Sequence, residues 1–497
     1  MVEEKHIIKK AVLEVYLSKA DGAFDAQNKA LNFFKEKMLP LIEKIIDKFS
    51  VANETIRIDK LELDFNNFNH LHSNDDALRK FEQHVEEKLI QLIAEKSDNF
   101  SGETIAAIKK IPKEKADEEL FIHLLKTGTL PWWAKTEEPI SLELLAQKIL
   151  QQSSDSIKRD LIAVLAIHAV RKRIAYKLST DSVEKIIALV CIASDELIKF
   201  ISEILNFVKD NIPLSENIRQ ELYEHALKYR AISGISMRLF LADFIKEKND
   251  LRFAEKIYSA SKTTTLNATA LTIKNALADT NTNFEGKIKK MFDVKDMKIF
   301  FSSDEKQKAE KKKLIKEGYF EPSDLIEFTG DYFVKNAGVI ILTPYLPMFL
   351  KELGLTDGKL FISDEAAERA VYLLQYLSSG NEENREEHEM VLNKILCGVE
   401  ITKPLILQFF ISEKEKEECS NLLQAVANNW QALKGTSGEG MRDAFFKRDG
   451  LLEQQSNGWN LKIEKTTIDI LLDKLPWGIS IIQMPWSMEM IFVNWVF

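Results

Sequence analysis

The sequence is poor in the residues that build irregular or cross-linked proteins. Its 497 residues include 18 glycines, 11 prolines and 3 cysteines. So little glycine and proline leaves few places for long irregular loops, and a mainly helical protein is expected. Cys191, Cys397 and Cys419 lie far apart, without a CxxC or Cys/His grouping. This pattern argues against a disulfide scaffold and fits a reduced compartment.

Excess positive charge and long apolar runs are also lacking. The net charge is −9, so no overall positive field attracts nucleic acid or an anionic membrane. The longest apolar run, Val339 to Leu350, is about half a bilayer span and contains two prolines. The N-terminus, MVEEKHIIKK, is a poor signal peptide. We therefore expect no nucleic-acid partner, no stable membrane insertion and a cytoplasmic site of synthesis.

Motifs for catalysis and cofactor binding are missing as well. No glycines occur in GxxxxGK or GxGxxG spacing, and there is no GxSxG. The pair His70 and His72 predicts a solvated turn, and Glu387-His388-Glu389 predicts an exposed helix start. No catalytic residue, metal or cofactor is predicted. A hydrolase or ligand-binding enzyme whose site assembles only in space stays open, because the chain has 77 Asp and Glu residues.

The N-terminal region combines strand and helix patterns. Val12 to Leu17 is rich in residues that favour strands, and apolar residues then recur at helical spacing as far as Phe49. Residues 56–58 and 61–65 alternate apolar and polar side chains, as a strand with one buried face does. We predict a small β-α-β unit over residues 1–72.

The rest of the chain predicts a long helical middle and a mixed C-terminal domain. Helical periodicity extends over residues 73–303, and residues 304–318 form a lysine-rich charged linker or helix. Residues 319–497 predict mixed α and β structure, with helices over Glu365 to Ser378 and Thr467 to Leu475. Strands are expected near Trp459 to Ile463, Ile479 to Ile482 and Ile491 to Trp495. The predicted fold class is mainly α with α+β ends.

Tryptophan is concentrated at two places. Trp132 and Trp133 follow Pro131, and four of the seven tryptophans lie in the last 39 residues, Trp477 and Trp486 again directly after proline. A Pro-Trp step fixes φ and removes a backbone donor, which favours rigid corners. A tryptophan ring buries a large apolar area and donates one N–H, so these rings suit a domain core or an interface. Both alternatives stay open from the residues alone.

Short motifs in a characteristic order carry a resemblance to a known family. They are His6-Ile-Ile-Lys-Lys, Ile58-Asp-Lys-Leu-Glu-Leu63, Leu124-Leu-Lys-Thr-Gly-Thr-Leu-Pro-Trp-Trp133, Lys335-Asn-Ala-Gly338, Thr343-Pro-Tyr-Leu-Pro347, Leu392-Asn-Lys-Ile-Leu-Cys-Gly398, Met441-Arg-Asp-Ala-Phe445, Arg448-Asp-Gly450, Leu475-Pro-Trp-Gly-Ile-Ser480, Pro485-Trp486 and Val493-Asn-Trp495. The set resembles the tape measure family of extracellular contractile injection systems, the phage-tail-like devices of bacteria. Residues from about 190 to 318 match none of its motifs.

The resemblance implies a non-enzymatic assembly protein that sets the length of the tail tube or its completion. Its implied partners are tube, sheath, baseplate or cap proteins, and its implied location is the cytoplasm during assembly, with retention in the released particle left open. A cap or terminator, an assembly chaperone and, less favoured, a hydrolase or a delivered effector are alternatives. The interface candidates are Trp132, Trp133, Trp477, Trp486 and Trp495. A ruler function would belong to the helical middle, with the two ends as anchors.

Overall fold

The computed structural model describes the chain in segments. They are residues 7–8, 11–16, 23–49, 54–58, 60–63, 75–94, 108–134, 139–152, 154–191, 194–211, 217–228, 240, 244, 248, 330–383 and 386–495. The chain divides into two compact units, Met1–Glu119 and Leu120–Phe497. The predicted charged linker at 304–318 and the pair His70 and His72 lie outside the described residues.

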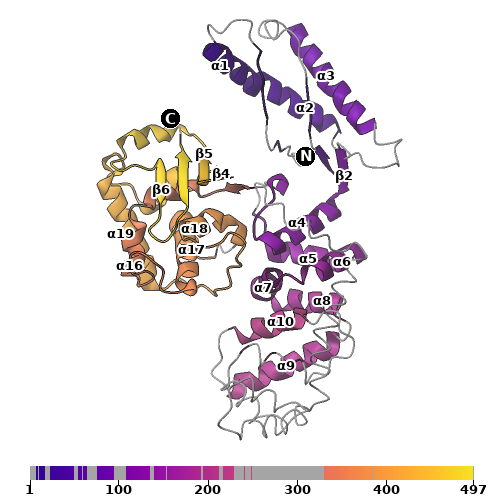
Figure 1. Ribbon diagram of the computed structural model, residues 1–497, viewed down its shortest axis with the longest axis vertical. Helices are drawn as coiled ribbons and strands as arrows, with labels where there is room; N and C mark the ends of the chain where they lie inside the picture. The colour runs from indigo at the N-terminus through magenta and orange to yellow at the C-terminus, as the bar shows by residue number, and fades with distance from the viewer. Residues whose placement is uncertain are drawn as a thin grey trace. The chain divides into compact units, whose positions relative to one another are not determined.

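The first unit is built on a small helical core and a two-stranded sheet (Figure 1). Its elements are α1 (Ala23–Phe33), the π-helical turn η1 (Phe34–Met38), α2 (Leu39–Phe49), β1 (Glu54–Ile58), α3 (Asp75–Ala94) and β2 (Ile108–Pro112). Apolar side chains of α1, η1 and α2 pack on α3, with Met38, Ile45, Phe81 and Val85 almost fully buried. The π-helical turn η1 comes directly before Pro40 of α2, and proline lacks the N–H that a continuous α-helix needs there.

The strand partner in this unit differs from the expected one. Residues 12–16, the described part of the predicted first strand, lie in no helix or strand. Instead β1 pairs antiparallel with β2, from Glu54 opposite Pro112 to Ile58 opposite Ile108. The alternation over Ile56 to Ile58 identified a strand, whereas Leu61 to Leu63, the described part of the second alternating stretch, lie in no strand. Alternation does not say which segment supplies the hydrogen bonds of a strand.

Helices fill the first part of the second unit, as the periodicity predicted. They are α4 (Lys113–Thr127), which starts in the first unit, the 3₁₀ turn η3 (Trp132–Ala134), α5 (Leu142–Gln152), α6 (Asp155–Val164), α7 (His168–Lys177), α8 (Thr180–Val190), α9 (Ser194–Asn211) and α10 (Ile218–Lys228). Serine begins two of them, because Ser154 and Ser179 accept hydrogen bonds from the N–H groups of Ile157 and Ser182. The helices share one continuous apolar core.

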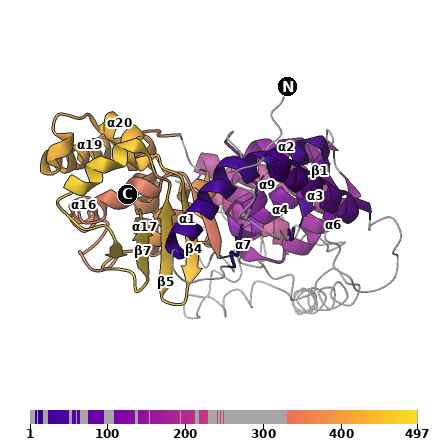
Figure 2. The same cartoon turned by 90° about the horizontal axis from the view of Figure 1, so that it is seen from above.

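The C-terminal part of this unit mixes helices and strands (Figure 2). Its elements are β3 (Asp331–Val334), η6 (Ala337–Leu342), α16 (Leu346–Glu352), α17 (Asp364–Ser379), η7 (Glu387–Met390), α18 (Val391–Leu396), α19 (Glu413–Asn429), η8 (Gln431–Leu433), α20 (Gly438–Met441), η9 (Arg442–Phe446), β4 (Gly450–Gln455), β5 (Gly458–Ile463), η10 (Thr467–Lys474), β6 (Ile481–Gln483) and β7 (Met490–Asn494). These elements enclose a second, separate apolar core.

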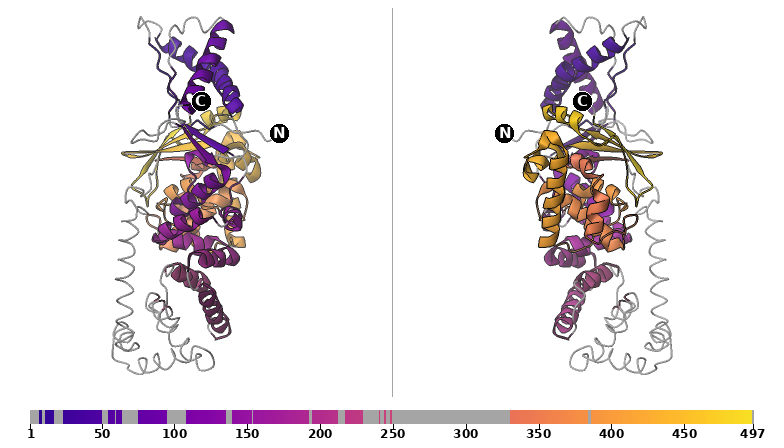
Figure 3. Two further views of the ribbon diagram at one scale, coloured as in Figure 1. Left: turned by 90° about the vertical axis from the view of Figure 1, so that its right-hand side faces the viewer. Right: turned by 90° about the vertical axis from the view of Figure 1, so that its left-hand side faces the viewer.

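The five strands form one sheet in the order β3-β4-β5-β7-β6, drawn in two further views in Figure 3. Neighbouring strands are antiparallel except β5 and β7, which are parallel. The strands predicted near Trp459, Ile479 and Ile491 are therefore confirmed as β5, β6 and β7. The helix predicted after Thr466 is the 3₁₀ helix η10, and the side chains of Thr466 and Asp469 form its capping box.

Candidate functional site

A buried ionic cluster lies where the helical part and the C-terminal part of the second unit meet. The side chains of Arg173 on α7, Glu387 on η7 and Lys394 on α18 are each at least nine-tenths buried. Arg173 lies on the apolar face of α7, between the fully buried Val170 and Ile174. We call these three residues the ionic junction, because it joins segments that are more than 200 residues apart in sequence.

Every donor of Arg173 is used. Its Nε and Nη2 donate to the two carboxylate oxygens of Glu387 at 3.0 and 2.9 Å, in a bidentate ion pair. Its Nη1 donates at 2.9 Å to the carbonyl oxygens of both Leu125 and Lys126, at the C-terminal end of α4. The second Nη2 proton binds the carbonyl of Thr402 at 2.6 Å. A guanidinium has five N–H groups, so none is left without an acceptor.

Lys394 completes the junction in the same way. Its Nζ donates to Glu387 Oε1 at 2.6 Å and to the carbonyls of Ile401 and Lys403 at 2.7 Å each. Burial alone would raise the pKa of Glu387, but Lys394 and Arg173 outweigh burial and lower that pKa to about 2. Burial lowers the pKa of Lys394 to about 8 against the opposing effect of Glu387. Both groups are therefore charged at neutral pH.

Gly128, in the motif that ends Pro-Trp-Trp, leaves room for the junction. It follows α4 with φ of +70°, a conformation that side chains disfavour. A Cβ atom at this position would lie 2.6 Å from Glu387 Cδ and 2.7 Å from Arg173 Nη2. Glycine is thus required here both by the backbone and by the ion pair that passes beside it.

A polar cavity of about 370 Å³ lies against the junction. Its walls combine charged and aromatic side chains, among them Lys177, Tyr372, Glu386 and Phe409. Lys177 Nζ donates to the Tyr372 hydroxyl at 2.8 Å, and the Tyr372 ring stacks on Phe409 with 5.0 Å between centroids. Burial raises the pKa of Glu386, whose carboxylate accepts from the N–H of Leu142 at 3.4 Å.

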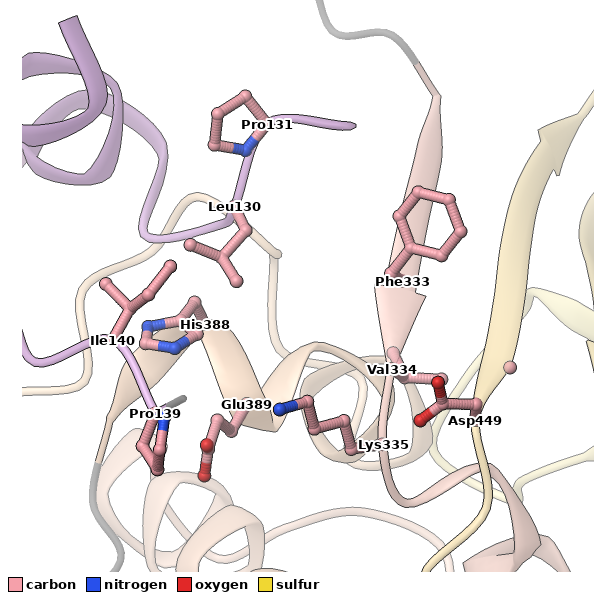
Figure 4. A pocket seen from close by; sticks show the side chains of 11 residues that line it. Leu130, Pro131, Pro139, Ile140, Phe333, Val334, Lys335, His388, Glu389 and Asp449 are labelled. Carbon is pink, nitrogen blue, oxygen red and sulfur yellow. The ribbon is translucent and has the colours of Figure 1, made fainter. Parts of the chain in front are cut away.

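A smaller, mainly apolar pocket lies on the other side of His388 (Figure 4). Leu130 and Pro131 of the Pro-Trp-Trp loop and Ile140 form one wall, and Phe333 of β3 forms the opposite one. The His388 ring lies beside Ile140 and lines both this pocket and the polar cavity. Burial lowers its pKa to about 4, so it is neutral at pH 7.

Other motifs that carry the resemblance also contact one another. The Asn336 side chain donates to the Asn393 side chain at 2.9 Å, which joins the Lys335–Gly338 motif to the Leu392–Gly398 motif. A Cβ atom on Gly338 would lie 2.7 Å from the carbonyl carbon of Phe445, in the Met441–Phe445 motif. Short motifs far apart in sequence are thus paired in the folded chain.

Three tryptophans of the interface prediction donate their indole N–H groups to acceptors within the chain. Trp477 donates to the Ile341 carbonyl at 3.1 Å, Trp486 to the Leu396 carbonyl at 2.8 Å and Trp495 to Asp469 at 3.1 Å. Trp495 is 5% exposed, whereas the other four keep part of their surface accessible. Trp132 and Trp133 begin η3, beside the loop that lines the smaller pocket.

The prediction of an exposed helix start at Glu387-His388-Glu389 is wrong. Glu387 and His388 are buried. The Glu387 carboxylate can be buried because Arg173, 214 residues away in sequence, and Lys394, on the following helix, supply positive charge. Sequence reasoning missed these two cations. A signal existed for Arg173, which lies three residues after Val170 and one before Ile174 and so interrupts the apolar face of an amphipathic helix.

Groups for metal or thiol chemistry are not assembled in the described part of the chain. No group of three His, Cys, Asp or Glu side chains there could hold a metal ion. The three cysteines are buried, and burial raises the pKa of Cys397 and raises that of Cys419 to about 12, so these two thiols are poor nucleophiles. No helix among the described residues is long and apolar enough to span a bilayer.

We predict that Gly128→Ala destabilises the protein much more than Gly354→Ala. Both glycines have φ near +70°, so both variants should lose about 1–2 kcal/mol to backbone strain. Only Gly128 faces the ion pair, and overpacking there should cost a further 1–3 kcal/mol, roughly; a Cβ atom on Gly354 meets nothing within 4 Å. Urea denaturation of both variants measures the difference. Equal losses would show that the junction tolerates the added methyl group.

We also predict that acid weakens the fold through Glu387. Its pKa of about 2 lies below the ordinary 4.5, so its contribution is complete above pH 4.5 and is lost as the pH falls toward 2. This gap corresponds to about 3 kcal/mol. At pH 7 Glu387→Gln should cost about 3–5 kcal/mol, because two buried cations lose their partner. Between pH 4.5 and 2 the wild type should lose about 3 kcal/mol more than this variant.

Glu389→Gln, on the same 3₁₀ helix but outside the junction, is the matched control and should follow the wild type in the same urea titrations. Parallel stability curves for the wild type and Glu387→Gln across this pH range would contradict the assignment of an ionised Glu387.

Comparison with known proteins assigns the chain a family. The family model described as contractile injection system tape measure protein matches residues 5–495. No curated protein and no solved structure matched. The matched region includes the whole ionic junction and all five tryptophans of the interface prediction. Because the match spans nearly the whole chain, the protein belongs to the contractile injection system tape measure protein family.

Proposed function

We propose that the protein acts in the assembly of a contractile injection particle as a folded, non-enzymatic body that helps determine when the tail tube is complete. The observation that carries this proposal is the ionic junction. Arg173 has all five donors used and Lys394 all three, which holds the helical part of the second unit to its C-terminal part in one defined arrangement.

A folded body is favoured over an extended ruler for the described residues. One straight helix of 497 residues would reach about 750 Å, since the rise is about 1.5 Å per residue. The described helices α5 to α10 have 10 to 18 residues each and pack on one another in a shared core. Such a bundle is suited to docking on another protein. We propose tube, sheath, baseplate or cap proteins as its partners, with assembly in the cytoplasm.

A ruler function is the second candidate, and the family description favours it because a tape measure implies a length. The two candidates differ in how tube length should respond to chain length. If the chain is a ruler, each added residue lengthens the tube. If it is a folded body that signals completion, the tube length does not depend on the length of the chain.

We predict that duplicating residues 250–299 leaves the tube length unchanged. These 50 residues would add about 75 Å if they formed a helix that measured the tube. Electron microscopy of particles from cells that express the duplicated chain gives the length distribution, with the wild-type chain as reference. A shift of the mean by about 75 Å would favour the ruler. Particles of normal number and length in cells without the chain would contradict both candidates.

We further propose that Trp486 marks a surface that contacts a protein of the particle. Its ring packs on Phe361 with 4.8 Å between centroids. On either side of Phe361, Leu360 and Ile362 are 62% and 66% exposed, and Met488, two residues after Trp486, is 96% exposed. Exposed apolar side chains grouped around a tryptophan are typical of interfaces. Trp132, Trp133 and Trp477 stay interface candidates, and we propose that Trp495 acts through the core.

We predict that Leu360→Asp combined with Ile362→Asp reduces particle yield at least tenfold while the melting temperature stays close to that of the wild type. The matched control is Met348→Asp on α16, since Met348 is 71% exposed but is not adjacent in sequence to Phe361 or Trp486. Counting particles by electron microscopy measures yield. Normal yield from the double variant would remove this surface from the assembly model.

A further inference from the structure

Among the described residues, one sheet edge and one strand-forming segment have no strand beside them. The edge is the outer side of β6, the last strand in the order β3-β4-β5-β7-β6 (Figure 1). The segment is Ala11 to Val15, which lies in no helix or strand. We propose that residues 11–15 of one copy of the chain pair with β6 of a second copy. This inference goes beyond the proposed function, because it concerns contacts between copies of this chain and involves no other protein of the particle.

The backbone of β6 has hydrogen-bonding groups that point away from the sheet. β6 and β7 are antiparallel, and the N–H of Val493 donates to the Ser480 carbonyl at 2.8 Å. Hydrogen-bonded residues alternate along an antiparallel pair, so Ser480 and Ile482 bond to β7. The N–H and C=O groups of Ile481 and Gln483 therefore point to the outer side, where the described part of the chain has no strand.

This edge lacks the charged side chains that commonly block a free strand. Lysine and other charged residues keep many natural sheet edges from pairing with another chain. From Leu475 to Met488 the sequence has no charged residue. The Ile481 side chain is 63% exposed, and Gln483 is exposed as well. The edge is therefore open to a further strand, although β6 is short and such a contact covers few residues.

The segment Ala11 to Val15 has the composition of the strand that this edge could accept. Its valines and leucine favour extended structure, and Val12 and Leu13 are 68% and 38% exposed. In its own unit β1 pairs with β2 and not with this segment. Apolar side chains of a strand-forming sequence thus face water, and a sheet edge would cover them.

The two faces of the segment match the two faces of the sheet at β6. Ile482 is buried on the core face, whereas Ile481 is exposed on the opposite face. An extended segment places Leu13 and Val15 on one side and Glu14 on the other. With Leu13 and Val15 beside Ile482 the apolar core face is extended, and Glu14 remains in water. The reverse orientation would bury the Glu14 carboxylate, which is costly, so this one charge selects the face.

A second copy is the favoured source of the strand. Residues 11–15 belong to none of the sheets of their own chain, and β6 has β7 as its neighbour among the described strands. Each copy therefore offers one segment and one edge to other copies. A contact between two different surfaces joins copies head to tail, into a ring if the rotation closes and into an open chain if it does not.

The first test measures the mass of the purified full chain by sedimentation velocity between about 1 and 100 µM. We expect the average mass to rise with concentration. Leu13→Pro combined with Val15→Pro removes two N–H groups from the segment, and Ile481→Lys places a charge on the edge; each should weaken association at least tenfold. Ile470→Lys is the matched control, since Ile470 is 69% exposed on η10, outside the sheet, and it should leave association unchanged.

Cross-linking identifies the two surfaces. Chains with Glu14→Cys are mixed with chains that carry Gln483→Cys, and a short bismaleimide reagent is added. We expect a product of twice the chain mass, in larger amount than from either variant alone. Gln455→Cys at the exposed end of β4 is the matched control and should give no such excess. The native cysteines are buried and so react slowly.

Melting temperatures check that each variant is folded, and Gln483→Lys replaces Ile481→Lys if the latter has no melting transition. A chain that stays monomeric up to about 100 µM would overturn the inference. Equal cross-linking of Gln483→Cys and Gln455→Cys would overturn it too. If Glu14→Cys and Gln483→Cys react only when both are in one chain, the same chain supplies the strand and pairing between copies is wrong. None of these results depends on whether tube length responds to this protein.

Discussion

The arrangement of the second unit depends on one ion pair. Arg173 and Glu387 form a bidentate contact in an interior from which water is largely excluded, and Lys394 adds a second cation to the same carboxylate. Removing two charges from water is costly, so such a group adds less to stability than its short distances suggest. Its main effect is to favour one packing of the helices over the alternatives. Any other packing of α7 against η7 and α18 would leave a charge buried without a partner.

The ionic junction also gives a role to the glycine and to two backbone carbonyls of one short motif, Leu124 to Trp133. Gly128 leaves space for the ion pair, while the carbonyls of Leu125 and Lys126 end α4 and bind the guanidinium. The negative end of the α4 dipole thereby faces a cation. In the C-terminal part, tryptophan side chains donate hydrogen bonds to backbone carbonyls. The indole of Trp486 satisfies a carbonyl of α18, and the Trp477 indole satisfies one of η6.

Local patterns predicted elements well and long-range contacts poorly. The alternation around Trp459 and the apolar spacing over Glu365 to Ser378 predicted β5 and α17, because one buried face leaves a regular trace in sequence. The pairing of β1 with β2 left no such trace. The burial of Glu387 left no such trace either, since it depends on Arg173, 214 residues away in sequence, together with Lys394 on the following helix. The candidate site was therefore inaccessible to sequence reasoning, although Arg173 on an apolar helix face hinted at it.

The topology of the sheet has a kinetic consequence. Helices α5 to α10 all lie within residues 142–228, so their mutual contacts close shorter loops of chain than the pairing of β3 with β4 does. By contrast, β3 must find β4 across more than 100 intervening residues, and β7 must insert between β5 and β6. The helical part is thus expected to be ordered while the sheet is still forming. Because Glu387 lies between β3 and β4 in the chain, we expect the ionic junction to close as the C-terminal part folds.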